Sequence, residues 1–181
     1  MDNFLEMIKK RRSIRKYKQK EVEKEKIHKI MQSALLSPSG KNINPWKFVV
    51  VEDKELLLEL SKAKTGGSQF LAQVPLAVVV LTDPEKTDIW IEDASIAATM
   101  IMLSAQDSGL GSCWIQIRNR MHQDNIKSEK YVKQILKIPD NLAVLCIIAI
   151  GYPDEKKSDK CIDEMKWNDV FVDKFDNRIS R

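Results

Sequence analysis

A run of basic residues from Lys9 to Lys18 lies close to the N-terminus, with the sequence KKRRSIRKYK. Arginine presents a planar fork that pairs with two phosphate oxygens at once, and the Ser13 hydroxyl adds a further donor. The run therefore has three interpretations: a phosphate grip, a solvated basic surface, or an electrostatic patch for nucleic acid or anionic lipid. Ile14 interrupts the run at a position able to turn inward, which a purely surface patch would not need.

A second candidate is the polar loop over residues 37–46, with the sequence SPSGKNINPW. Ser, Pro, Gly and Asn dominate turns for backbone reasons, so an ordinary helix-to-strand connection is the plain interpretation. The loop is nevertheless long for that purpose, and long loops more often carry function. An Asn side chain holds both a donor and an acceptor, which suits the mixed polar edge of a heteroaromatic ring.

A third candidate is the segment 109–115, with the sequence GLGSCWI. Its plain interpretation is a capped helix that turns into a strand with Trp114 in the core. Trp114 stands where the last glycine of a G-x-G-x-x-G motif would be, so a Rossmann dinucleotide site has no support. The two histidines lack metal-ligand spacing, and the three cysteines contain no C-x-x-C, so neither a metal site nor a disulfide framework is predicted.

Composition is that of a globular protein of one domain. The 181 residues are 43% hydrophobic and 31% charged, with a net charge of +4 that is too small to indicate nucleic-acid binding by itself. No run of about 18 apolar residues is present, which argues against a membrane span. The N-terminal residues lack the basic and apolar regions of a secretory signal, so a cytoplasmic protein is expected.

Hydrophobic periodicity predicts alternating helices and strands. A first helix has Phe4 and Leu5 on its apolar face and Asp2 or Asn3 as its cap, and further helices are expected over 23–36, 55–62, 88–108 and 130–136. Strands are expected over 48–51, 76–81, 113–115 and 143–150. The last of these is apolar throughout, which places it in the middle of a sheet. Residues 154–181 are charged and weakly periodic, so they cannot build a core alone.

Four motifs, in this order, resemble the nitroreductase family of flavoproteins over residues 1 to about 157. They are Arg11-Arg12-Ser13-Ile14-Arg15, Pro38-Ser39-x-x-Asn42-x-x-Pro45-Trp46, Gly109-x-Gly111-x-Cys113-Trp114 and Ile150-Gly151-Tyr152-Pro153. The resemblance implies an α+β fold with a central, mostly antiparallel sheet flanked by helices. It also implies an intertwined homodimer with two FMN molecules at its interface. Residues 1–157 would form the FMN-binding domain, and 158–181 an arm that packs on the partner subunit.

The resemblance also implies roles for individual residues. One subunit would supply the phosphate contacts and the contacts along one face and edge of the flavin, from Arg11, Arg12, Ser13, Arg15, Trp114, Ile115, Lys156 and Lys157. The other subunit would supply ring contacts from Pro38, Ser39 and Asn42. The family commonly has Gln before Pro-Trp, where this chain has the shorter Asn44. Some branches also place Asn and Lys near the flavin where Ser68 to Leu71 stands here, which leaves Arg15 as the chief candidate for tuning the reduced flavin.

The implied function is that of an FMN-dependent NAD(P)H oxidoreductase with ping-pong turnover. Hydride would pass from NADH or NADPH to flavin N5, and electrons would then pass to a nitroaromatic, a quinone or another conjugated small molecule. Because the flavin carries the chemistry, no catalytic side chain is expected. The alternatives are the same fold with dehalogenase or flavin-fragmenting activity, or a non-catalytic basic module for nucleic acid or membrane. The preferred interpretation has neither nucleic acid nor membrane as a partner.

Overall fold

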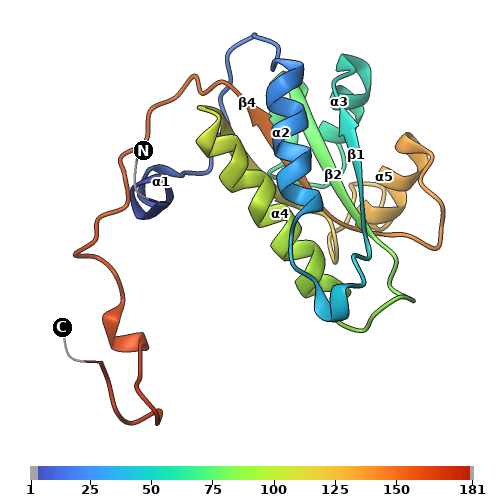
Figure 1. The fold of residues 1–181 in the computed structure, drawn as a ribbon. Helices are drawn as coiled ribbons and strands as arrows, with labels where there is room; N and C mark the ends of the chain where they lie inside the picture. The colour runs from blue at the N-terminus through green and yellow to red at the C-terminus, as the bar shows by residue number, and fades with distance from the viewer. Residues whose placement is uncertain (1–3, 180–181) are drawn as a thin grey trace.

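A four-stranded antiparallel sheet organises the fold in the computed structural model, which describes residues 4–179 (Figure 1). The strands lie in the order β1-β2-β4-β3, and each neighbouring pair is antiparallel. In chain order they are β1 Trp46–Val51, β2 Leu76–Thr82, β3 Gly111–Gln116 and β4 Ala143–Gly151. β4 is an inner strand and is buried along almost its whole length, which confirms the prediction made from its apolar sequence.

Helices cover both faces of the sheet, and this confirms the expected α+β class (Figure 1). The helices are α1 Phe4–Lys10, α2 Lys24–Leu35, α3 Lys54–Ser61, α4 Trp90–Asp107 and α5 Ser128–Leu136. Because side chains alternate along a strand, Val78 and Val80 of β2 face the layer of α2 and α4, whereas Ala77 and Val79 face the layer of α3 and α5. The short 3-10 helix Gln69–Gln73 belongs to the second layer.

α4 is the long helix predicted from the wide stripe of small and apolar residues. Its buried positions include Ala94, Ala97, Ala98, Ile101 and Ala105. These small side chains let α2 and the sheet approach the helix axis closely. At about 1.5 Å per residue, 18 residues give α4 a length of about 27 Å. It therefore runs across one face of the molecule, and residues that pack at its two ends lie far apart.

The N-terminal helix packs only loosely on this body, against α4, and the C-terminal segment extends away from it. α1 has no buried residue, and Phe4 on its apolar face is 62% exposed. Residues 158–179, called the arm below, run past α1 and away from the sheet (Figure 1). The arm carries exposed apolar side chains, among them Trp167 and Phe175. The expected cap at Asp2 or Asn3, and residues 180 and 181 of the expected C-terminal arm, lie outside the described residues.

Candidate functional site

The basic segment of residues 11–16 is held against the sheet by its one apolar member. Ile14 is 7% exposed, and its backbone N–H donates to the carbonyl of Ser112 at 3.0 Å. Ser13 forms a parallel bridge with Ser112, so the segment lies along the outer edge of β3. A Cβ atom on Gly111 would lie 2.8 Å from Ile14 Cγ1, so a glycine is what admits this close approach. The inward turn expected of Ile14 is confirmed.

Tyr17 closes the turn that follows. Its hydroxyl donates a 2.5 Å hydrogen bond to the Ile14 carbonyl, and its ring is buried beside Gly151. Burial raises the pKa of Tyr17 far above its ordinary value, so the phenol remains a proton donor. Tyr17 also bridges Pro153 at the end of β4. The segment is thus fixed on both sides of Arg15.

Residues that follow β4 lie directly beside the basic segment. Glu155 Oε1 accepts from the backbone N–H of Arg15 at 2.5 Å and of Lys16 at 3.2 Å, and these bonds lower the pKa of Glu155. The Lys157 ammonium donates to the Ser13 carbonyl at 2.7 Å. Glu155 was not predicted from the sequence. It stands between Asp154 and Lys156, and nothing in this local sequence distinguishes it.

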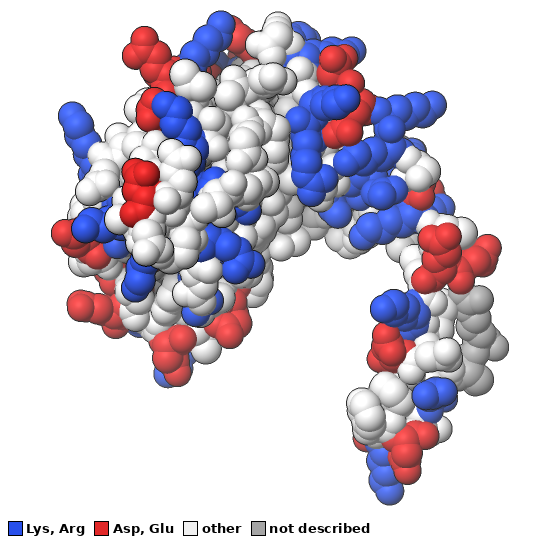
Figure 2. Space-filling model, turned by 180° about the vertical axis from the view of Figure 1, so that it is seen from behind, with Lys and Arg blue, Asp and Glu red and all other residues white. Residues whose placement is uncertain are grey.

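Together these residues form a cluster of positive charge, called the basic cradle below: Arg11, Arg12, Ser13, Arg15, Lys156 and Lys157. A pocket of about 230 Å³ opens here, with Lys10, Arg12, Lys156 and Lys157 among its lining residues. Figure 2 shows Lys and Arg gathered where the arm leaves the body of the molecule.

Within residues 4–179, the guanidinium groups of Arg11 and Arg15 have neither a hydrogen-bond nor an ion-pair partner. The Arg12 guanidinium donates to the Ser158 carbonyl. Such a set of unpaired forks fits a phosphate dianion.

Cys113 lies beneath the basic cradle. Its thiol is 2% exposed, and burial raises its pKa although Arg15 and Lys157 act in the opposite direction. A neutral thiol leaves the charge of the cradle uncompensated from below. Glu155 Oε2 lies 3.7 Å from the Lys157 ammonium and compensates part of the charge of the cradle, so the guanidinium groups of Arg11 and Arg15 are the charges that stay available to a ligand from outside.

The polar loop is rigid through its own side chains. The Ser39 hydroxyl donates to Asn44 Oδ1 at 2.8 Å and accepts from the Asn44 N–H at 2.9 Å, while Asn44 Nδ2 donates to Asn42 Oδ1 at 3.3 Å. Asn42 and Asn44 have φ of 55° and 51°, in the left-handed region that Asn tolerates. Pro38, Asn42 and Asn44 are exposed. Asn44, which stands where the family commonly has Gln, is thus used to shape the loop.

The loop and the basic cradle lie at opposite ends of α4. The Gly40 N–H donates to Asp93 Oδ1 at 2.9 Å, in the first turn of the helix. The cradle packs on Gly111, just past the other end of α4. About 27 Å of helix separates the two sets. Within one chain, the structure therefore unites the Arg11–Arg15 set with Lys156 and Lys157, but it does not bring Ser39, Asn42 and Asn44 to them.

The segment 109–115 serves as a capped helix followed by a strand. Gly109 ends α4 with φ of +75°, as its position predicted. In β3, Trp114 is half-buried against the α2 and α4 layer, where its Nε1 donates to Gln116 Oε1 at 2.9 Å, and Ile115 is buried in the other layer. Both side chains are thus committed to packing. What this strand offers to a ligand beside the cradle is its backbone.

His122, which the sequence placed in a polar stretch, is 3% exposed and stacks on Tyr131 with ring centroids 4.1 Å apart. Residues 4–179 contain no group of three His, Cys, Asp or Glu side chains that could hold a metal ion. In that same range, none of the helices has the length and apolarity required to cross a bilayer.

Comparisons with known proteins give one consistent result. Residues 8–67 and 55–152 match the model of the nitroreductase family. An FMN-dependent nitroreductase from Clostridium difficile R20291 has a similar structure, with a TM-score of 0.93 and 53% sequence identity over 94% of this chain and 99% of that chain.

Two curated relatives are also similar along most of this chain. A protein from Archaeoglobus fulgidus, provisionally named NADH dehydrogenase/NAD(P)H nitroreductase, is 38% identical over 87% of this chain and 89% of its own length. An FMN reductase (NADPH) from Bacillus subtilis is 25% identical over 84% of this chain and 67% of its own length.

Proposed function

The chain belongs to the nitroreductase family, and we propose that it is an FMN-dependent oxidoreductase that takes electrons from NADH or NADPH. The observation that supports this most directly is the basic cradle, in which the guanidinium groups of Arg11 and Arg15 lack partners among residues 4–179. A flavin phosphate carries two negative charges and oxygens in the spacing that an arginine fork matches. Arg11, Arg12 and the Ser13 hydroxyl would hold that phosphate, with Lys156 and Lys157 beside it.

The residues next to the cradle would orient the ring. The segment 11–16 lies along β3, so a ligand anchored by its phosphate would extend along the backbone of Trp114 and Ile115. Arg15 would face the polar edge of the ring, because its backbone is fixed by Glu155 while its guanidinium is unpaired within the described residues. When bound, FMN would supply the redox chemistry: it accepts hydride from the nicotinamide and passes electrons to a conjugated acceptor such as a nitroaromatic or a quinone.

A cation at that edge has a defined electrostatic effect. Two unit charges 4 Å apart interact by about 4 kcal/mol at an effective dielectric constant of about 20. Arg15 would therefore favour the reduced, more negative state of the ring. The chain needs no acid–base pair for this role, since its own groups only bind, orient and tune.

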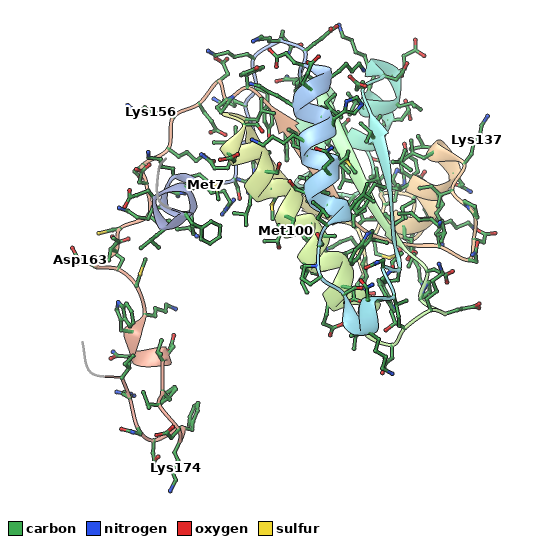
Figure 3. All side chains as sticks on the ribbon, viewed as in Figure 1. Met7, Met100, Lys137, Lys156, Asp163 and Lys174 are labelled. Carbon is green, nitrogen blue, oxygen red and sulfur yellow. The ribbon has the colours of Figure 1, made fainter. Side chains whose placement is uncertain are left out.

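A second copy of the chain would complete each site. Ser39, Asn42 and Asn44 lie at the far end of α4 from the cradle, so these ring contacts would come from the partner subunit. A groove of about 650 Å³ between α1, α2 and α4, lined by Phe4, Met7 and Met100 among others, lies open in the single chain. Figure 3 shows Met7 on α1 and Met100 on α4. Exposed Trp167 and Phe175 of the arm would pack on the partner and remove apolar surface from water.

The test is spectroscopic. The purified protein, incubated with FMN and desalted, is expected to retain one FMN per chain and to show the visible absorption of oxidised flavin. Riboflavin, which lacks the phosphate, is expected to bind at least tenfold more weakly because it cannot use the cradle. Anaerobic NADH or NADPH should bleach the spectrum, and an acceptor panel should restore it. A colourless protein that retains no added FMN would refute the proposal.

A further inference from the structure

Asp93 is a buried carboxylate that neither the sequence motifs nor the proposed chemistry uses. It is 2% exposed and stands in the first turn of α4. Its Oδ1 atom accepts the Gly40 N–H at 2.9 Å. Its Oδ2 atom is buried and has no hydrogen-bond partner among the described residues. Burying a carboxylate costs free energy unless its bonds repay it, so a residue kept here calls for an explanation.

Gly40 is one of the points at which the polar loop is bonded to the body of the protein; at the end of the loop, the Pro45 carbonyl accepts from the Asp83 N–H at 3.1 Å. A Cβ atom there would lie 2.3 Å from Ile89 Cδ1 and 4.0 Å from Asp93 Oδ1, so the backbone passes close to the start of α4. The residues that follow have the left-handed φ values of 51°, 55° and 51° at Lys41, Asn42 and Asn44. Such a backbone persists only where its surroundings fix it. The bond to Asp93 fixes its first residue.

We propose that Asp93 is a positioning residue, which holds the 38–44 loop so that Ser39, Asn42 and Asn44 present their polar groups to the flavin ring bound by the partner subunit. This inference rests on the proposed function, since it takes the ring as the target of the loop. The acceptor oxygen is the feature that matters, because one backbone N–H of the loop depends on it. Asp93 itself is not expected to touch the ring.

The test compares three substitutions of Asp93. Asp93→Leu keeps the branch at Cγ but has no acceptor, and it replaces the buried carboxylate by an apolar group, so it is expected to fold. Asp93→Ala also removes the acceptor. Asp93→Asn keeps an oxygen at the same place and is the rescue variant. Glu92→Ala removes an exposed carboxylate from the same helical turn and is the matched control.

The first measurement needs no flavin. In the flavin-free protein, hydrogen exchange of the Gly40 amide is expected to be at least tenfold faster in the Leu and Ala variants, and close to wild type in Asp93→Asn and Glu92→Ala. An equally slow exchange in Asp93→Leu would overturn the inference. An equal acceleration of Gly40 exchange in Asp93→Asn and Asp93→Leu would also overturn it, because the Asn side chain keeps the acceptor oxygen.

The second measurement reports the ring. In the Leu and Ala variants, FMN is expected to bind about tenfold more weakly and to lose the visible circular dichroism of the bound ring, while riboflavin remains the poorer ligand. Unchanged affinity and dichroism in both variants would overturn the inference. Failure of the wild-type protein to retain FMN would instead refute the proposed function. The exchange measurement at Gly40 would still test the role of Asp93 in holding the loop, because it uses flavin-free protein.

Discussion

The Lys157 ammonium donates a 2.7 Å hydrogen bond to the Ser13 carbonyl, and it thereby joins the chain after β4 to the N-terminal basic segment. The substitution Lys157→Met keeps the aliphatic stem but removes both the charge and this bond. Lys157 would also lie beside the flavin phosphate, and a hydrogen bond to a charged group contributes roughly 1.5–3 kcal/mol, so FMN is expected to bind about tenfold more weakly or worse. Equilibrium titration followed by flavin fluorescence measures the change. Lys160→Met, at an exposed position of the same stretch, should bind FMN as the wild type does.

Gly111 allows the basic segment to pack on β3, and Gly111→Ala is expected to push Ile14 outward. The added Cβ would lie 2.8 Å from Ile14 Cγ1 and 2.9 Å from Ile14 Cβ. Overpacking of this kind costs about 1–3 kcal/mol of unfolding free energy, and the displaced segment should also bind FMN less tightly. Urea unfolding and FMN titration measure the two effects. Gly66→Ala, where nothing lies within 4 Å of the new atom, should change neither; equal effects in both variants would contradict the packing argument.

The lowered pKa of Glu23 predicts that the free energy of unfolding decreases in acid. Its hydrogen bond from the Tyr152 hydroxyl, at 2.6 Å, is the main reason that its pKa falls from the ordinary value of 4.5 to about 2. A carboxyl whose pKa is lower in the folded state stabilises the protein above the unfolded pKa, and that contribution is lost as the pH falls from about 4.5 to 2.

Glu23→Gln should therefore flatten the decrease of unfolding free energy over this pH range. Urea unfolding at pH 7, 4 and 3 measures it. Glu25→Gln, at an exposed position in the first turn of α2, is expected to retain the wild-type slope. A wild-type slope in Glu23→Gln would show that the bond to Tyr152 does not control the acid limb.

Arg15→Gln is expected to make the bound flavin harder to reduce. Loss of the cation removes an attraction for the negative charge gained on reduction, so the two-electron midpoint potential should move to more negative values by on the order of 30 mV. Spectroelectrochemical titration of the FMN-loaded variant measures the shift. The control is Lys18→Gln, an exposed basic position just after the basic segment. An unchanged potential in Arg15→Gln would place its guanidinium away from the ring.

Met100→Glu tests whether the groove between α1 and α4 is an interface between copies of the chain. A charge at this position on α4 would have to be buried twice in a symmetric dimer, so the dimer dissociation constant should rise more than tenfold. Sedimentation velocity measures the assembly, and FMN should be released as monomer accumulates. Leu58→Glu changes an exposed apolar residue of α3, on the other face of the sheet, and should leave assembly intact. A wild type that stays monomeric would refute the shared site.

Hydrophobic periodicity predicted the helices and strands well where one face of the element, or the whole element, is buried. α2 and α4 lie within two residues of their expected ends, and β4 is an inner strand as its apolar run indicated. The basic run around Ser13 is visible in the sequence, but its role toward a flavin phosphate came from the resemblance to the family and stays a prediction.

The acidic residues that hold the site were not foreseen. Glu155 accepts from a backbone 140 positions away, and Asp93 from one 53 positions away. The local sequence around a residue does not reveal such a long-range bond, because an acidic residue in the same local sequence could equally lie on the solvated surface. The burial of His122 was missed for a similar reason, because it depends on Tyr131 from α5.

The bridge between Ser13 and Ser112 has a consequence for handling of the protein. β3 is an outer strand, and the N-terminal segment covers part of its free side. Exposed strand borders are where separate molecules join into aggregates. A ligand that immobilises Arg11 and Arg15 would keep this cover in place, whereas a preparation stripped of ligand would release it more often. Turbidity on storage should therefore increase as the fraction of chains without FMN increases, and addition of FMN should remove this increase.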